Sequence, residues 1–323
     1  MCNKPLIILT GPTAAGKTAL SIRLAKQING AIISADSMQV YRHMDIGSAK
    51  ITQEEMGGVP HYLIDVLEPY EEFSVHTFKR LAETALEEIY AKGMIPIVVG
   101  GTGFYIQALL YDIQFTDTDT DTVYRSELES LADSKGSEWV HDQLKLVDPE
   151  AAAQIHANNV KRVIRALEYF HQTGQKISEH NAQERQRTSP YNHLYFVLNR
   201  DRAELYRRID LRVDMMLEAG LLDEVKKLKE MGYTRDMVAM KGLGYKEILD
   251  YFSGEITLDE AVYRVKRDSR HFAKRQLTWF RRERDVTWVE LDGRSEDEVL
   301  EGLIAQLKAK GIVKDKLERI NTK

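Results

Sequence analysis

A strand, a glycine-containing loop and a helix follow one another at the start of the chain, and they constrain its fold more than any other stretch. The apolar run 6–10 predicts a buried strand, and residues 19–25 have helical spacing and good helix formers. Between them stands Gly-Pro-Thr-Ala-Ala-Gly-Lys-Thr, residues 11–18. In this context the pattern G-x-x-x-x-G-K-[ST] predicts a loop that binds phosphate.

Each residue type in this loop has a physical task. Gly11 and Gly16 let the backbone curl so that N–H groups point inward, and the helix N-terminus adds positive partial charge. Lys17 supplies a cation, and the Thr18 hydroxyl is a ligand for Mg²⁺, which prefers oxygen. A glycine-rich turn without a ligand is the alternative, and the complete spacing argues against it. We therefore expect a phosphorylated ligand and Mg²⁺ here.

Composition narrows the class of protein. The chain has 323 residues, 43% of them hydrophobic, which is enough for one large domain or two. Its single cysteine, Cys2, has no partner for a disulfide, which fits a reducing cytoplasm. The short apolar run at the N-terminus does not resemble a signal peptide, and no apolar stretch is long enough to cross a membrane. We expect a cytoplasmic protein.

Further apolar runs predict an α/β fold with a parallel sheet. Strands are expected at 31–35, 61–66, 95–99 and 194–198, alternating with amphipathic helices. Asp36 follows the strand 31–35, and ligands bind at the carboxyl ends of parallel strands, so Asp36 is expected to face the phosphate loop. A turn-capping role is the alternative for Asp36. Gly-Gly-Thr-Gly at 100–103 either presents Thr102 at the same edge or is a packing turn.

The polar stretch 116–122, which alternates Thr and Asp, has the composition of a linker. We expect three segments: a core of residues 1–118, a helical insert of residues 119–190, and a second part of the core at 191–323.

Basic residues gather in three places although the net charge is −5. The insert carries Lys161, Arg162 and Arg165 on one expected helix, and a glycine-bearing loop spans 241–246. Residues 264–284 hold nine basic and two acidic residues, so compensating carboxylates at helical spacing are nearly absent. Such a surface is typical of nucleic-acid or oligophosphate binding, whereas a solvated basic face is the alternative, above all for the insert. Arg42 and Lys50, taken alone, are expected to be surface residues.

Taken together, the motifs resemble those of the tRNA dimethylallyltransferases, also called isopentenyl-diphosphate:tRNA transferases. The matching segments run in order over roughly residues 6–285. They are the phosphate loop at 11–18, Asp-Ser-Met-Gln-Val-Tyr-Arg at 36–42, Met-Asp-Ile-Gly-Ser-Ala-Lys at 44–50, Gly-Gly-Thr-Gly at 100–103, Arg-Ala-Leu-Glu at 165–168, Gly-Tyr-Lys-Glu at 244–247 and Ala-Lys-Arg-Gln-Leu-Thr-Trp-Phe-Arg at 273–281.

The resemblance implies transfer of a dimethylallyl group from dimethylallyl diphosphate to N6 of adenine 37, in tRNAs that read codons starting with U. It implies a nucleotide-kinase-like P-loop fold with an inserted all-helical domain that contacts the anticodon stem-loop. A monomer is expected. A base must leave its stack to reach such a site, and basic patches would hold the RNA meanwhile.

The resemblance also assigns residues. Asp36 and Thr102 would be catalytic, with Asp36 as the base for the adenine amine. The diphosphate would be bound by Gly11, Pro12, Thr13, Ala14, Ala15, Gly16, Lys17, Thr18 and Arg212, with Arg208 as the alternative to Arg212. The tRNA would be bound by Asp36, Ser37, Met38, Gln39, Thr102, Arg125, Lys161, Arg162, Val163, Ile164, Arg165, Lys241, Gly242, Leu243, Gly244, Tyr245, Lys246, Lys274, Arg275, Gln276, Leu277, Thr278, Trp279, Phe280 and Arg281.

Two other functions share parts of this pattern. A small-molecule kinase would use the same loop and would have Asp36 accept a proton from a substrate hydroxyl. The basic segment 264–284 argues against it, because a small substrate needs few cations. An RNA-binding protein that uses a nucleotide as a switch should carry an acidic residue just after an apolar strand. Asp65 is a poor candidate for that residue, since it stands within its run.

Overall fold

The structure, a computed structural model, describes residues 4–115 and 122–314 and divides them between two units. One unit runs up to Leu110 and resumes at Ser189, and the other comprises Tyr111–Thr188. The expected linker at 116–122 and the expected boundary at 118 fall almost wholly outside the described residues. Each unit is described by itself.

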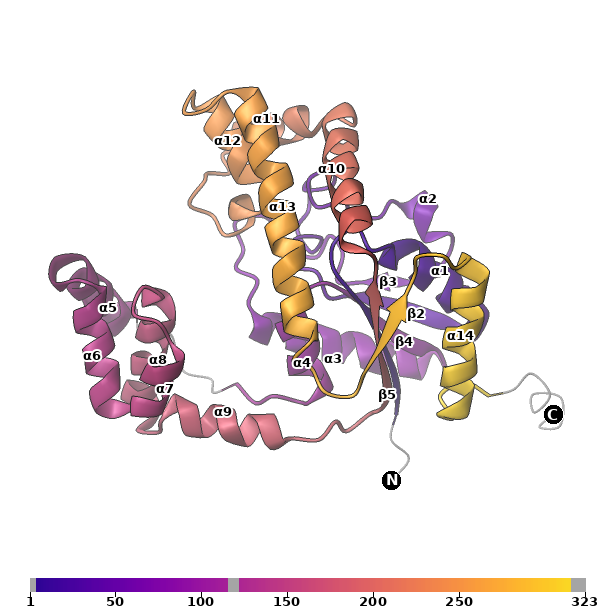
Figure 1. Cartoon of the computed structure of the whole chain (residues 1–323), viewed down its shortest axis with the longest axis horizontal. Coiled ribbons are helices and arrows are strands. Elements are labelled where there is room, and N and C mark those ends of the chain that lie inside the picture. Colours follow the sequence, from indigo (N-terminus) through magenta and orange to yellow (C-terminus); the bar gives the residue numbers. More distant parts are fainter. Residues whose placement is uncertain (1–3, 116–121, 315–323) are drawn as a thin grey trace. The chain divides into compact units, whose positions relative to one another are not determined.

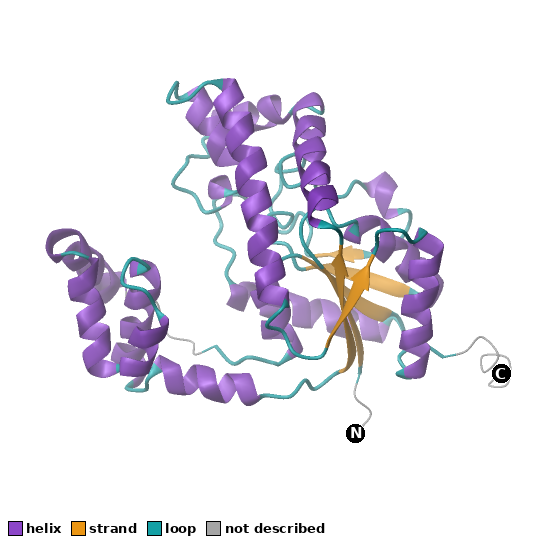
Figure 2. Cartoon of the chain, in the orientation of Figure 1, coloured by secondary structure: helices purple, strands orange, loops and turns teal. Residues whose placement is uncertain are grey.

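The larger unit is built on a sheet of six strands, all parallel, in the order β3-β2-β4-β1-β5-β6 (Figures 1 and 2). The predicted α/β class with a parallel sheet is confirmed. The strands are β1 (Pro5–Thr10), β2 (Gly30–Ser34), β3 (His61–Tyr62), β4 (Ile95–Gly100), β5 (Asn192–Asn199) and β6 (Val286–Glu290).

Two strands differ from the prediction. The expected strand 61–66 ends at Tyr62, because Leu63 and Asp65 adopt left-handed backbone angles that a strand does not accommodate. Strand β6 was not predicted. It is an edge strand of five residues and mostly only partly buried, so its sequence lacks a continuous apolar run.

Helices cover both faces of the sheet. On one face α1 (Lys17–Ile28) packs with α14 (Glu296–Ala309), and Leu24, Val299 and Leu303 join the strands in one hydrophobic cluster. On the other face α3 (Val75–Ala91) packs with α4 (Gly103–Leu110). The strands are therefore buried on both sides, which explains their near-continuous apolar sequences.

The remaining helices of this unit include two long ones, α10 and α13, which pack against each other beyond the carboxyl edge of the sheet (Figure 1). The elements are α2 (Gln53–Met56), α10 (Arg202–Glu218), α11 (Leu221–Glu230), the 3₁₀ turn η1 (Ala239–Lys241), α12 (Tyr245–Phe252) and α13 (Leu258–Phe280). Within the described ranges, no helix combines the length and apolar character needed to cross a bilayer.

The smaller unit is all-helical in its described residues and has a hydrophobic core of its own, with Leu128, Val140, Leu144 and Val163 at its centre. Buried Asp148 accepts hydrogen bonds from the Ala151 and Ser178 backbone N–H groups and so joins two of its helices. The helices are α5 (Thr122–Lys135), α6 (Ser137–Val147), α7 (Pro149–Gln154), α8 (Val160–Thr173) and α9 (Ile177–Gln186).

The turn between β4 and α4 permits three close approaches that only glycine allows. A Cβ on Gly100 would lie 2.2 Å from the Ala35 carbonyl oxygen at the end of β2. A Cβ on Gly101 or Gly103 would lie 2.1 or 2.2 Å from side chains of α13. The Gly-Gly-Thr-Gly motif therefore seats helix α13 against the sheet edge, so packing is at least one of its roles.

This packing predicts a contrast between two glycine-to-alanine variants. Gly100→Ala forces the β2 and β4 ends apart, and we expect a loss of roughly 3 kcal/mol, the range of overpacked cores. Gly302→Ala in α14 is the matched control. Its Cβ would meet only the end of the Arg294 side chain, at 3.4 Å, and alanine favours the helix by about 0.5–1 kcal/mol. Thermal unfolding followed by circular dichroism measures both. Equal Tm values for the two variants would contradict the packing argument.

Candidate active site

Residues that follow the carboxyl ends of β1, β2 and β4 line one cleft of about 390 Å³ together with residues of α10 and α13. Its lining mixes phosphate-loop residues, one carboxylate, several arginines and a few apolar side chains. The lining residues are Thr13, Ala14, Gly16, Lys17, Thr18, Ala19, Asp36, Gln39, Ala49, Gly101, Arg207, Arg208, Leu211, Arg212, Met215, Phe272 and Gln276.

The phosphate loop has the curled backbone that its sequence predicts. Gly16 caps α1 with φ +108°, and a Cβ on Gly11 would lie 2.5 Å from the Leu198 carbonyl oxygen, so both positions require glycine. Ala14 is also left-handed, with φ +63°. Its carbonyl accepts a hydrogen bond from Arg208 Nε at 2.9 Å, which helps to hold the strained turn.

Cations dominate the floor of this cleft. Lys17 Nζ donates to the carbonyl oxygens of Gly11 (2.9 Å) and Pro12 (2.8 Å). Loss of hydration and, to a smaller extent, the nearby charge of Arg212 lower the pKa of Lys17 to about 8, although the charge of Asp36 acts in the opposite direction. Burial also lowers the pKa of Arg212, again opposed by Asp36. Two poorly hydrated cations beside one carboxylate favour an anionic ligand.

Asp36 lies at the end of β2 and lines the cleft. Its Oδ1 accepts hydrogen bonds from the backbone N–H groups of Met38 (2.8 Å) and Gln39 (3.3 Å), which is the turn-capping role considered from the sequence. Among the described residues, Oδ2 accepts no hydrogen bond. The two interpretations of Asp36 are thus compatible, because Oδ1 caps the turn and Oδ2 remains available as a proton acceptor.

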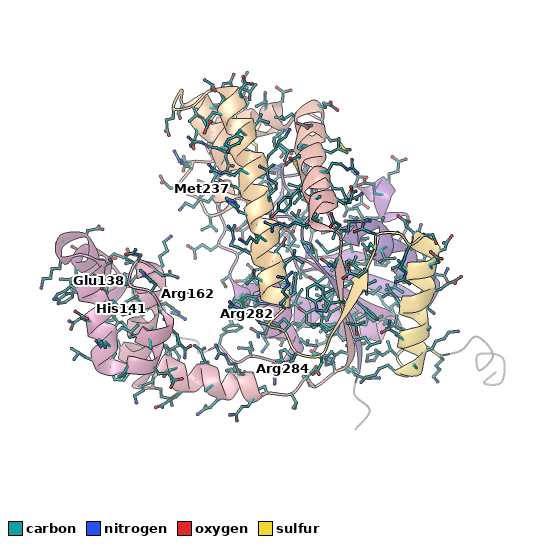
Figure 3. All side chains as sticks on the ribbon, viewed as in Figure 1. Glu138, His141, Arg162, Met237, Arg282 and Arg284 are labelled. Carbon is teal, nitrogen blue, oxygen red and sulfur yellow. The ribbon has the colours of Figure 1, made fainter. Side chains whose placement is uncertain are left out.

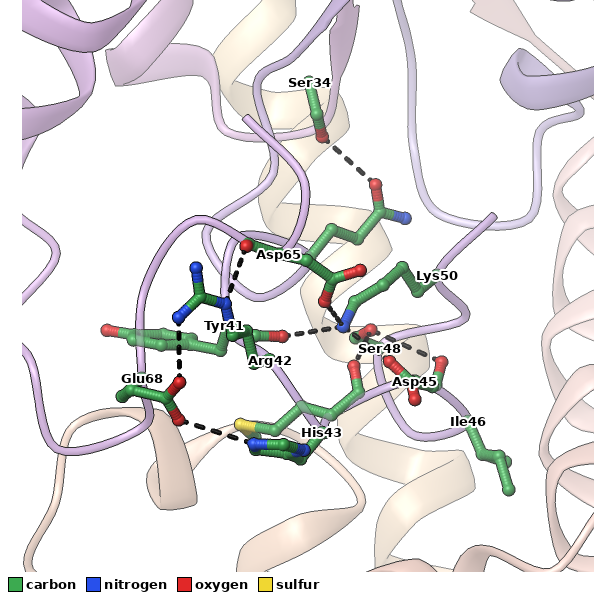
Figure 4. Close-up of polar contacts among 12 residues, drawn as sticks. Ser34, Tyr41, Arg42, His43, Asp45, Ile46, Ser48, Lys50, Asp65 and Glu68 are labelled. Atoms are coloured by element: carbon green, nitrogen blue, oxygen red, sulfur yellow. Dashed lines mark hydrogen bonds and ion pairs between the residues drawn. The ribbon is translucent and has the colours of Figure 1, made fainter. Parts of the chain in front are cut away.

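The loop 36–50 is closed by a buried lysine. Lys50 Nζ donates to the Tyr41 carbonyl (2.7 Å) and to carboxylates of Asp45 and Asp65 (2.6 Å each), as Figure 4 shows. Its side chain is only 4% exposed, so the prediction of a surface position for Lys50 is wrong. Arg42 is half-exposed, as predicted, and pairs with Glu68 at 2.9 Å.

A second anchor holds the same loop from helix α11. The carboxylate of Glu224 accepts hydrogen bonds from the N–H groups of Asp45, Ile46 and Gly47 (2.7–3.0 Å) and from the Tyr245 hydroxyl (2.8 Å). No motif in the sequence indicates this role for Glu224, because its partners in the loop 36–50 lie 177–179 residues away.

Thr102 sits beside the cleft rather than in its lining. Its N–H donates to the Ala35 carbonyl at 3.2 Å, and its own carbonyl accepts from the N–H groups of Tyr105 and Ile106 at the start of α4. This backbone pairing places Thr102 next to Asp36 along the sheet edge, which is the neighbourhood predicted for it.

Gln276 of α13 is the residue that joins two walls of the cleft. Its Oε1 accepts from the Thr13 N–H at 2.8 Å, and its Nε2 donates to the Gly101 carbonyl at 3.0 Å. The Thr13 N–H is thus engaged within the protein, and the Ala15 N–H donates to the Pro12 carbonyl. Phosphate binding by the loop amides therefore rests on the other positions predicted for it.

Helix α13 is less uniformly basic than its sequence suggests. In its first half, Arg264 pairs with Glu260, Lys266 with Asp214, and Arg270 with Asp210. The prediction that compensating carboxylates are nearly absent is therefore wrong for this half, because two of these partners come from α10. Farther along, basic side chains are exposed and line a shallow groove of about 410 Å³; Figure 3 labels one of them, Arg282. These are Lys274, Arg275 and Arg282.

The helical unit presents a second basic group. Lys161 and Arg162 are exposed on α8. Arg125 and Arg165 both pair with Glu168, at 2.8 and 3.0 Å, and Glu168 is fully buried. The carboxylate fixes two half-exposed guanidinium groups side by side, which the sequence motif Arg-Ala-Leu-Glu alone does not reveal.

Five side chains predicted to bind tRNA are buried. Val163 and Ile164 belong to the core of the helical unit, Tyr245 is fully buried with its hydroxyl on Glu224, and Gln276 and Phe280 are 6% and 0% exposed. In this structure these side chains are packing or positioning groups, and their contact with tRNA stays a prediction. The exposed residues beside them, such as Lys161, Lys241 and Lys274, are the ones a backbone phosphate can reach.

The sequence missed part of the cleft wall. Arg207 and the apolar residues Leu211, Met215 and Phe272 line it. Leu211 and Met215 are 50% and 58% exposed although apolar. Their spacing of four on α10, together with Arg208 and Arg212, was an available signal that this helix face borders a ligand.

The described residues contain no group of three or more His, Cys, Asp or Glu side chains that could hold a metal by themselves. Thr18 is exposed and lines the cleft near Asp36. A hydroxyl and phosphate oxygens with several waters are an ordinary donor set for Mg²⁺, so the residues present fit that ion.

The sequence matches two family models and a curated relative. The model for "IPP transferase" matches residues 39–283, and that for "Isopentenyl transferase" matches residues 4–69. A tRNA dimethylallyltransferase of Lachnoclostridium phytofermentans is 62% identical over 96% of this chain and 100% of its own length.

Two crystal structures are also similar. A tRNA isopentenylpyrophosphate transferase from Bacillus halodurans has a TM-score of 0.71 and 46% identity, with 98% of this chain and 99% of that chain covered. A eukaryotic dimethylallyltransferase acting on tRNA has a TM-score of 0.81 and 30% identity, covering 97% of this chain and 81% of that one.

The pKa of Lys17 gives a testable pH dependence. A lysine with a pKa of about 8 is protonated below that pH, so inorganic diphosphate should bind well at pH 7 and lose affinity as the pH rises through 8. Above pH 8 the loss approaches tenfold per pH unit if binding requires the charged form. Isothermal titration calorimetry at several pH values measures it.

Lys17→Arg is the control, because its guanidinium stays charged throughout this range. The ionisation of diphosphate itself affects both proteins equally, so the comparison isolates the contribution of residue 17. Identical pH profiles for the two proteins would contradict the assignment of this titration to Lys17.

Proposed function

The chain belongs to the IPP transferase family of tRNA dimethylallyltransferases, and from this we propose that it transfers a dimethylallyl group from dimethylallyl diphosphate to N6 of adenine 37 in tRNA. The tRNAs are those that read codons starting with U. The observation that carries the proposal is a phosphate loop and one carboxylate, Asp36, bordering the same cleft. Diphosphate is the other product.

The diphosphate belongs on the cationic side of the cleft. Negative charge develops on it as the carbon–oxygen bond breaks, and Lys17, Arg208 and Arg212 surround that position with the loop amides. Fixed positive groups of this kind stabilise a developing charge without reorganisation. The apolar side chains Leu211 and Phe272 border the same cleft and suit a five-carbon group.

The allylic donor fits this chemistry better than its isopentenyl isomer. Positive charge on C1 of a dimethylallyl group spreads over the double bond, whereas an isopentenyl group has its double bond one carbon too far away. The names of the similar proteins mention both groups. The mechanism therefore selects dimethylallyl diphosphate.

Asp36 is the proposed base. The N6 lone pair forms the bond to C1, the electron pair of the broken C1–O bond leaves with diphosphate, and the N6 proton passes to Oδ2 of Asp36. The hydrogen bonds from Met38 and Gln39 to Oδ1 keep the carboxylate oriented for this transfer. Thr102, next to it along the sheet edge, would flank the flipped adenine.

Mg²⁺ is the proposed cofactor. Thr18 and the diphosphate oxygens would hold it, with water completing its shell, and it would neutralise charge on the leaving group. We also propose that the protein acts as a monomer. Since the proposed substrate is tRNA, we propose that the protein acts in the cytoplasm.

The proposal is tested by incubating unmodified tRNA, Mg²⁺ and dimethylallyl diphosphate labelled in the prenyl group, and by counting label in the RNA. Isopentenyl diphosphate is the matched donor control. Label from the allylic donor alone supports the proposal. No label, together with ATP consumption when small hydroxylated metabolites are added, would indicate the small-molecule kinase instead.

Replacing the base separates chemistry from binding. Asp36→Asn keeps the shape and the Oδ1 acceptor but removes the proton acceptor, so we expect kcat to fall by about 10²–10⁴ with tRNA affinity within twofold. Single-turnover transfer and filter binding measure the two quantities. Unchanged turnover would remove Asp36 as the base.

The exposed end of α13 should carry part of the RNA affinity. Changing Lys274 and Arg275 to alanine removes two phosphate contacts, so the slope of log K against log salt should become less steep by about 1.4 to 1.8. Changing the ion-paired Lys266 and Arg270 to alanine is the control on the same helix. Equal slopes for both pairs and for the unaltered protein would place the RNA elsewhere.

A further inference from the structure

We propose that Gln276 is a positioning residue for the diphosphate loop and not an RNA contact, although it lies within the most basic segment of the chain. The inference rests on the proposed function, because it concerns the donor side of that reaction. It separates two tasks within residues 273–281, which the sequence motif presents as a single tRNA-binding segment.

The contacts of Gln276 point inward. Its carboxamide accepts from the Thr13 N–H through Oε1 (2.8 Å) and donates to the Gly101 carbonyl through Nε2 (3.0 Å). The side chain is 6% exposed. A carboxamide that uses both ends within the protein and is nearly covered has little left to offer a nucleic acid.

The Gln276 carboxamide packs closely against Gly101. A Cβ on Gly101 would lie 2.1 Å from Gln276 Nε2 and 3.3 Å from its Cδ, and the next nearest atom is the Gly11 carbonyl oxygen at 3.8 Å. A side chain at position 101 would therefore have to displace the Gln276 carboxamide. The amide also fixes the phosphate loop at Thr13, whereas Arg208 and Arg200 donate to the carbonyl oxygens of Ala14 and Ala15.

The neighbours of Gln276 on α13 face the opposite way. Lys274 and Arg275 are exposed and line the groove with His271 and Arg282. One helix therefore presents cations to the outside while a neutral amide holds the donor loop on the inside. Loss of Gln276 should loosen the loop without removing a charge from the RNA-facing surface.

The test is a double-mutant cycle between Gln276→Ala and Gly101→Ala, with Lys274→Ala as the control on the outer face. Gln276→Ala and Gly101→Ala should each weaken inorganic diphosphate binding and raise the KM for dimethylallyl diphosphate by roughly tenfold. Gln276→Ala removes two hydrogen bonds, and Gly101→Ala displaces the carboxamide that makes them. Their tRNA affinity and its salt slope should match the unaltered protein. Lys274→Ala should show the reverse pattern.

The double variant sharpens the result. Once Gln276 is alanine, the space for a Cβ at position 101 is open, so the double variant should bind diphosphate no more weakly than either single variant. Multiplied defects would overturn the proposed coupling. Weaker tRNA binding by Gln276→Ala with normal diphosphate affinity would instead make Gln276 an RNA contact.

Two readouts keep the inference separate from the proposed function. Diphosphate affinity needs no turnover, so it tests Gln276 even if the unaltered protein transfers nothing to tRNA. Normal tRNA affinity shows that a variant is folded. A variant that keeps both affinities and the KM, and differs only in Tm, would make Gln276 a purely structural residue and overturn the proposal.

Discussion

The site depends on the close approach of helix α13 to the turn after β4. At Gly100, Gly101 and Gly103, the position that a Cβ would occupy lies within 2.1–2.2 Å of an atom of another residue. Gln276 and Trp279 occupy two of these spaces, so the helix lies directly on the edge of the sheet where the phosphate loop begins. Helix α10 packs against α13 and brings its arginines to the same edge. A longer turn residue would move both helices away from the cleft.

Charge is segregated more finely than the net value of −5 suggests. Aspartates of α10 neutralise the first half of α13, whereas the second half is exposed. Inside the cleft the cations outnumber the carboxylates, because Lys17 and Arg212 share one carboxylate, Asp36. Both cations have lowered pKa values. Desolvated cations of this kind are unfavourable until an anion binds, which supports the proposal that the cleft binds diphosphate and the outer surface binds tRNA.

Sequence reasoning succeeded where the signal is local. The phosphate loop, the position of Asp36 after β2 and the parallel sheet follow from periodicity and from a motif with a backbone mechanism. It failed where the decisive partner lies far along the chain: Lys50 is buried by Asp45 and Asp65, and Glu224 holds a loop 177–179 residues away. The resemblance named Gln276 as part of a tRNA-binding run, but only coordinates show which way one helix residue points. Burial of a polar side chain is a tertiary property that spacing alone does not encode.

A phosphate loop of this type is usually associated with breaking a P–O bond, and the proposed reaction breaks a C–O bond instead. The loop can serve both because its amides and lysine stabilise charge on phosphate oxygens, whichever bond to that group is cleaved. What must differ is the acceptor side. A phosphoryl acceptor needs a hydroxyl in line with phosphorus, whereas carbon transfer needs an amine at C1 of the donor and a base for its proton. Asp36 stands at the end of β2, with β4 between it and β1, the strand that leads into the phosphate loop. In the proposed reaction the five-carbon group would lie between the diphosphate on that loop and Asp36.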